Sequence, residues 1–161
     1  MSIDAASYRQ IAGHFTTGVT VVTTAVDGWL HGITANAFAS VSLDPLQLLV
    51  CIDKEAYAHE QLEKAGRFAV NILAEAQQEI SNQFASKSPP EQGSLRGAAY
   101  RLGPNGMPIL EGCLAYLECE LTDRCAGGDH TIFVGRVLDG ELAQDTPPLL
   151  FYRGSYQRLQ S

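Results

Sequence analysis

The alternation of hydrophobic and polar positions predicts a chain built mainly of β-strands. Residues 17–26 are β-branched almost throughout, and an Asp-Gly pair separates them from a second extended segment at residues 29–38. Two extended segments joined by Asp-Gly predict a β-hairpin. Further strands are expected over residues 46–53, 67–74, 113–128, 130–142 and 148–156. Successive strands joined by short turns favour an antiparallel barrel over a doubly wound sheet.

Helical spacing of apolar residues predicts two or three peripheral helices, over residues 4–15, 54–66 and 75–86. Asp4 is a capping residue at the start of the first, and Gly66 ends the second. Residues 87–106 are rich in Pro and Gly, which predicts a loop on the surface. With 161 residues, we expect a single domain over residues 1–161.

One extended segment, residues 32–45, differs in composition from a core strand. It places hydroxyls and an amide (Thr34, Asn36, Ser40 and Ser42) among small residues, in a segment that we interpret as a central strand. A strand with small side chains lets a planar ring lie close to the backbone, where main-chain groups can reach the edge of the ring. The segment therefore indicates a ligand site.

Composition and charge narrow the classes of function. A hydrophobic fraction of 45% indicates a globular protein, and a net charge of −7 without a basic run argues against nucleic-acid and anionic-membrane partners. No apolar run approaches the roughly 20 residues that span a bilayer. The first residues lack a secretory signal, so we expect a cytoplasmic protein.

Several familiar reactive sites are absent from the sequence. It contains no GxGxxG, phosphate loop, GxSxG or HExxH motif, and its cysteines and histidines lack the spacing of a metal site, so no metal is expected. The cysteines are interpreted as reduced thiols, most of them buried. Glu118 and Glu120 share one face of a predicted strand, and we interpret them as a solvated edge.

The polar segments that remain resemble, in combination, the flavin reductase-like family. The motifs TGVT, TANxFxSVSLDP, FAVN, GDH and YRG occur here in that order, and the match spans the chain from about Tyr8 to Leu159. Two positions depart from the family pattern: Ala37 stands where many members carry Ser, and Leu46 stands where a second Pro is common.

The resemblance implies a mainly β fold, an antiparallel FMN-binding split β-barrel with peripheral helices. It implies an NAD(P)H-dependent flavin reductase, an oxidoreductase that transfers a hydride from NADH or NADPH to FMN or FAD and supplies reduced flavin to a separate oxygenase component. It also implies a homodimer. Such a reaction needs no protein nucleophile, because the flavin carries the chemistry. Two alternatives stay open: a tightly bound flavin that reduces an organic or ferric substrate, and a non-catalytic flavin-binding split barrel.

Motif matching also implies roles for individual residues. The contacts expected with the flavin ring and its ribityl phosphate are those of Thr34, Ala35, Asn36, Ser40, Val41 and Ser42. The contacts expected around the phosphate and elsewhere on the cofactor are those of Cys51, Ile52, Asp53, Lys54, His59, Phe84, Ala85, Tyr152, Arg153 and Gly154. His130 is expected to position the nicotinamide. On spacing alone, Lys54 is equally compatible with a solvated side chain, and His130 with a turn residue.

Overall fold

A computed structural model of the protein describes residues 2–91 and 94–160. Its helices are α1 (Ala5–Ala12), α2 (Tyr57–Ala65) and α3 (Gln78–Phe84), with a 3-10 turn η1 (Glu75–Gln77) before α3. Its strands are β1 (Thr17–Gly18), β2 (Thr20–Val26), β3 (Trp29–Ala35), β4 (Phe38–Leu43), β5 (Leu46–Asp53), β6 (Arg67–Ile72), β7 (Tyr100–Leu102), β8 (Pro108–Leu110), β9 (Ala115–Gly127), β10 (His130–Leu142), β11 (Leu150–Tyr152) and β12 (Ser155–Gln157).

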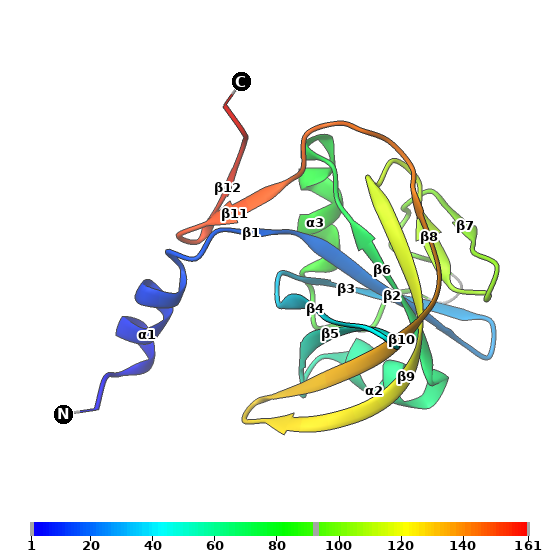
Figure 1. The fold of residues 1–161 in the computed structure, drawn as a ribbon, viewed down its shortest axis with the longest axis horizontal. Helices are drawn as coiled ribbons and strands as arrows, with labels where there is room; N and C mark the ends of the chain where they lie inside the picture. The colour runs from blue at the N-terminus through cyan, green and yellow to red at the C-terminus, as the bar shows by residue number, and fades with distance from the viewer. Residues whose placement is uncertain (1, 92–93, 161) are drawn as a thin grey trace.

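Seven of these strands form one curled antiparallel sheet in the order β3-β2-β6-β9-β10-β5-β4 (Figure 1). Two smaller sheets, β1-β11-β12 and β7-β8, complete the described strands. The predicted fold class, mainly β and antiparallel with peripheral helices, is confirmed. The predicted hairpin is confirmed as well: β2 pairs with β3 around Asp27 and Gly28, both at positive φ (51° and 80°), as a two-residue hairpin turn requires.

The segment 32–45 does not form one central strand, so that prediction is wrong. β3 ends at Ala35 and β4 begins at Phe38, and the two strands lie at opposite edges of the seven-stranded sheet. The sheet curls until β3 contacts β5, the neighbour of β4. Asn36 and Ala37 therefore carry the chain from one edge of the sheet to the other.

The helices differ in how they pack. Asp4 caps α1 by accepting a hydrogen bond from the backbone N–H of Ser7 at 2.7 Å, as predicted, yet none of the residues of α1 is buried. Figure 1 shows this helix standing apart from the barrel, beside β11 and β12. Helix α2 ends at Gly66 as predicted, but it begins at Tyr57, so Lys54 lies in the turn before it.

Two clusters of apolar side chains form most of the core. One fills the inside of the curled sheet around Phe68 and Phe133. The other lies between α3 and the sheet and contains Phe84, which is fully buried. A Cβ atom at Gly32 would lie 2.8 Å from the Phe84 ring, so only glycine lets α3 pack this closely on β3.

The stretch 87–106 contains structure that the sequence did not predict. Strand β7 lies within it and pairs with β8, and the chain between them covers Glu118. The carboxylate of Glu118 is fully buried and accepts hydrogen bonds from the backbone N–H groups of Asn105 and Met107. The interpretation of a solvated edge is therefore wrong for Glu118, whereas Glu120 is partly exposed in an ion pair.

All four cysteines are free: Cys113 and Cys119 are buried, Cys51 is half-buried and Cys125 is exposed. Within residues 2–91 and 94–160, no helix has the length and apolar character that a membrane span needs. The same residues contain no cluster of three potential metal ligands among His, Cys, Asp and Glu.

Candidate functional site

A cleft of about 260 Å³ opens beside the link between the two sheet edges. Its walls come from the end of β3, the link itself, the end of β5, the chain after α3 and the start of β10. The structure brings together in this cleft the following residues for which a cofactor contact was predicted: Thr34, Ala35, Asn36, Cys51, Ile52, Asp53, Ala85 and His130.

Small side chains form much of the cleft wall. Ala35, Ala37 and Ala85 present only methyl groups, so a flat ligand can approach the backbone there. The hydroxyl of Thr34 donates to the backbone carbonyl of Ser81 at 2.6 Å and so fastens β3 to α3. Burial raises the pKa of the Cys51 thiol, which keeps this wall residue uncharged. The exposed side chain of Asn36 makes no hydrogen bond to the described residues and is available to a ligand.

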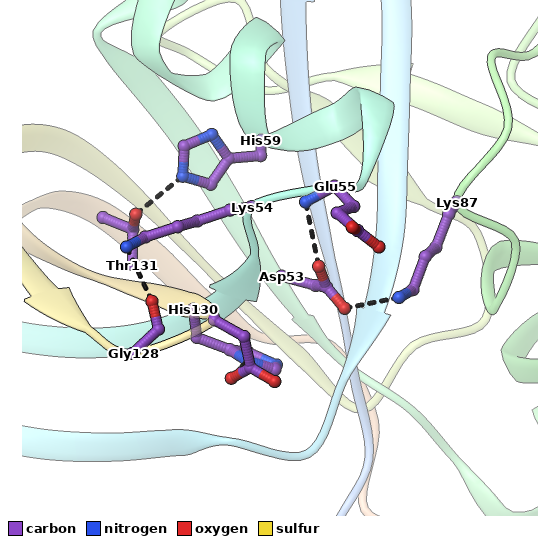
Figure 2. A network of polar contacts seen from close by, with 9 residues as sticks. Asp53, Lys54, Glu55, His59, Lys87, Gly128, His130 and Thr131 are labelled. Carbon is purple, nitrogen blue, oxygen red and sulfur yellow. Dashed lines mark hydrogen bonds and ion pairs between the residues drawn. The ribbon is translucent and has the colours of Figure 1, made fainter.

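Charged groups gather at the end of β5 (Figure 2). One oxygen of Asp53 accepts a hydrogen bond from the backbone N–H of Glu55 at 2.9 Å, and the other forms an ion pair with Lys87 Nζ at 2.5 Å. The hydrogen bond from Lys87, helped by that from Glu55, holds the pKa of the Asp53 carboxyl below its ordinary value. The same contact raises the pKa of Lys87, so both groups are ionised at neutral pH.

His130 lies opposite Asp53 in the ladder between β10 and β5. Its Nδ1 is 2.8 Å from Oδ1 of Asp129, and this hydrogen bond lowers the pKa of the Asp129 carboxyl. The imidazole lines the cleft with 41% of its surface exposed. A ring held at one nitrogen and open to the cleft can stack on a ligand or hydrogen-bond to it.

Lys54 and His59 are close to the cleft in sequence, but neither lines it. The ammonium group of Lys54 donates to the backbone carbonyl of Gly128 at 2.7 Å, in the turn between β9 and β10. The ring of His59 lies 2.7 Å from the hydroxyl of Thr131 and packs on Phe133. In Figure 2 both side chains lie on the side of Asp53 away from Lys87.

The remaining predicted residues lie elsewhere. Ser40 and Val41 are exposed on β4, and the hydroxyl of Ser42 accepts a hydrogen bond from the backbone N–H of Asp44. Phe84 is fully buried behind Gly32, where its role in this chain is packing.

A second group of predicted residues lies on the turn between β11 and β12: Tyr152, Arg153 and Gly154. This turn rests against α1, and the backbone N–H of Arg153 donates to the carbonyl of Gly13 at 2.8 Å. None of the three side chains lines the cleft of its own chain.

Lys87 is a charged cleft residue that sequence reasoning missed, and the apolar Ile33 was missed as well. Lys87 follows α3 within the stretch interpreted as a surface loop, and no local pattern distinguishes it from other surface lysines. Its position results from a contact distant in sequence, since the backbone N–H of Tyr57 donates to the carbonyl of Lys87 at 3.0 Å.

Comparison with known proteins matches this chain to one family along most of its length. The sequence model described as "Flavin reductase like domain" matches residues 12–160. The reductase subunit HsaB of a flavin-dependent monooxygenase from Mycobacterium tuberculosis is 39% identical over 160 residues, which cover 98% of this chain and 84% of that protein.

Two solved structures extend the match to the fold. The flavin reductase component BorF of a bacterial two-component tryptophan halogenase is 38% identical with a TM-score of 0.91, over 98% of this chain and 99% of that one. The NADH:FAD oxidoreductase of Streptomyces globisporus, in complex with NAD and FAD fragments, is 36% identical with a TM-score of 0.90, over 98% of this chain and 93% of that one.

Proposed function

Because this chain belongs to the flavin reductase-like family, we propose that it reduces a flavin nucleotide with NADH and supplies the reduced flavin to a separate monooxygenase. The observation that carries the proposal is the cleft at the sheet edges, where small residues, His130 and Lys87 face one space. Relatives named as reductase components of two-component enzymes support the transfer to a partner, and a relative named as an NADH:FAD oxidoreductase supports NADH as the donor.

The residues of the cleft fit a flavin nucleotide. Three alanines leave room for a flat ring against the backbone, Asn36 offers an amide for its polar edge, and Lys87 offers a positive charge for a phosphate. When bound, the flavin supplies the ring that accepts the hydride. His130, steadied by Asp129, is placed to position the nicotinamide, and the chain has only to hold the two rings in contact.

The proposal is tested with purified protein, FMN or FAD, and NADH or NADPH. We expect NADH to be oxidised only when a flavin is present, measured as loss of the near-ultraviolet absorbance of the reduced nicotinamide. Absence of oxidation with every pair of flavin and nicotinamide would overturn the proposal. The flavin content of the purified protein separates two modes of use: a colourless protein supports a diffusible flavin, and one flavin per chain indicates a bound group.

We also propose that the protein is a homodimer. Tyr8 and Ile11 of α1 are each 64% exposed, and Phe15, which follows the helix, is 80% exposed, so α1 and the residues after it present apolar side chains that their own chain does not cover. An isolated helix of eight residues is not stable in water, which indicates that another surface supports α1. The hairpin of β11 and β12, which rests against α1, carries Tyr152, Arg153 and Gly154, and in this proposal they reach the cofactor of the partner subunit.

Sedimentation of the purified protein tests this assembly. We expect a mass twice that of the chain, and expect Ile11→Glu to shift the protein towards monomer because it places a charge within the apolar contact. A wild-type protein that sediments as a monomer at micromolar concentration would refute the homodimer.

A further inference from the structure

Among the described residues that line the cleft, Lys87 is the one lysine or arginine, and it pairs with a carboxylate within the same cleft. A cation and an anion that both face a ligand site suggest that one of them changes partner when the ligand binds. We propose that Lys87 binds the phosphate of the flavin nucleotide and that Asp53 is its counter-ion only while the cleft is free of ligand. This inference rests on the proposed function, and it names the residue that distinguishes a flavin nucleotide from riboflavin.

The neighbouring lysine does not take this role. The ammonium group of Lys54 donates to the carbonyl of Gly128 at 2.7 Å and points to the turn between β9 and β10. Figure 2 shows Lys54 and Lys87 approaching from opposite sides of Asp53. The ammonium group of Lys54 does not line the cleft, whereas Lys87 does.

The backbone of Lys87 is fixed and its side chain is free to move. Its carbonyl accepts a hydrogen bond from the N–H of Tyr57 at the first residue of α2, which holds the residue at the cleft. Its side chain is 55% exposed, so the ammonium group has open space into which it can move away from Asp53. A partly exposed ion pair is weak, whereas a phosphate brings up to two negative charges and more acceptor oxygens.

The surrounding charges make Lys87 necessary for an anionic ligand. Asp53, Glu55 and Asp129 are all close enough to raise the pKa of Lys87. Without a cation, these carboxylates would repel a phosphate from this end of the cleft. Lys87 therefore determines whether a phosphorylated flavin is preferred over an uncharged one.

The experiment compares dissociation constants for FMN and riboflavin, measured by flavin fluorescence in the full chain. We expect the wild type to prefer FMN and Lys87→Met to reduce that preference about tenfold, equivalent to ~1.4 kcal/mol. Lys87→Arg retains the charge and should retain the preference. Lys64→Met is the matched control, since Lys64 is 54% exposed and pairs with Glu60 outside the cleft.

A second variant tests the exchange of partners. Asp53→Asn keeps an oxygen to accept the hydrogen bond from Glu55 but removes the charge that holds Lys87, so we expect the preference for FMN over riboflavin to increase. An unchanged or lowered preference in Asp53→Asn would contradict the exchange. Thermal unfolding of each variant checks that the protein is folded.

Three results would overturn the role of Lys87. The first is an unchanged preference for FMN in Lys87→Met, and the second is a preference that is lost in Lys54→Met instead. The third is a Lys87→Met variant with an unchanged flavin preference but a raised KM for NADH when riboflavin is the acceptor. The last would assign Lys87 to a phosphate of the dinucleotide. If the wild type binds neither flavin, the proposed function itself fails. Turnover with an unchanged preference in Lys87→Met would refute only this inference.

Discussion

Replacing Glu118 should destabilise the protein more than replacing a partly exposed glutamate on the same strand. Its carboxylate is fully buried and accepts hydrogen bonds from the backbone N–H groups of Asn105 at 3.0 Å and Met107 at 3.1 Å. It also accepts a hydrogen bond from the side-chain amide of Asn105 at 3.1 Å. Glu118→Gln replaces one acceptor oxygen with a donor, so at least one of these N–H groups loses its partner. An unmade hydrogen bond of this kind costs ~1–3 kcal/mol.

Glu118→Ala removes both acceptors and leaves a void, so we expect a loss of about 3–5 kcal/mol. In a chain of 161 residues each kcal/mol corresponds to roughly 2–4 °C of melting temperature, so the Gln variant should melt about 2–12 °C lower and the Ala variant about 6–20 °C lower. Circular dichroism during heating measures both. Glu120→Gln is the control, because Glu120 is two residues away on the same strand and its ion pair is partly exposed.

A Glu118→Gln variant with the melting temperature of the wild type would refute the reasoning. It would show that the chain between β7 and β8 does not depend on two acceptor oxygens at this position. Equal losses in Glu118→Gln and Glu120→Gln would refute it too, because the effect would then follow from removing any negative charge on β9.

Three further predictions concern the cleft. His130→Ala should lower kcat/KM for NADH roughly tenfold, as expected for one lost contact, while the dissociation constant for flavin stays unchanged. A collapse of flavin binding in this variant would contradict the assignment of His130 to the nicotinamide. Asn36→Leu should weaken flavin binding with a melting temperature within about 2 °C of the wild type, because the side chain is exposed and has no described partner. Asp53→Asn should lower stability at neutral pH, and by less as the pH falls. The ion pair with Lys87 depresses the pKa of Asp53 below 3.8, so its stabilisation is present above that value and is lost as the pH falls through the depressed pKa. Denaturant midpoints at neutral pH and at about pH 3 measure this, and a difference between the two proteins that does not shrink in acid would contradict it.

Features that depend on local sequence were predicted correctly. The hairpin between β2 and β3 follows from Asp27 and Gly28, because a two-residue turn at positive φ determines which residues pair on either side. The end of α2 follows in the same way from Gly66, which adopts the left-handed conformation at φ 65°. Each of these signals acts within a few residues, so one sequence contains all of the information.

Features that depend on distant contacts were not predictable in this way. The alternating pattern around Glu118 is compatible with either a solvated or a buried face, and burial is decided by residues 103–107, which fold over it. Strand β7 was missed because a three-residue strand in a stretch rich in Pro and Gly has no periodicity to detect. Lys87 was missed for a related reason, since its contacts at the cleft are with Tyr57 and Asp53, both distant in sequence.

The candidate site was predicted in part because β5 and β10 are neighbours. His130 and Asp53 are distant in sequence yet lie opposite each other in one ladder. Motif order identified both residues, but it could not distinguish the side chains that face the cleft from those that face the hairpin turn. This difference separates Lys87 from Lys54. It depends on the direction in which the backbone continues after α3, before Lys87, and after β5, before Lys54.

The small residues of segment 32–45 serve two different purposes, and the position of the sheet edges explains why. Gly32 and Thr34 lie on β3 under α3, where one makes room for Phe84 and the other hydrogen-bonds to Ser81. Ala35 to Ala37 come next, where the chain leaves one edge of the sheet for the other. The backbone carbonyls of Ala35, Asn36 and Ala37 all accept hydrogen bonds within the chain, and the small side chains of the two alanines let a flat ligand approach the backbone here. The cleft therefore lies where the sheet does not close, and Ala35, Asn36 and Ala37 are residues of the segment that line this gap.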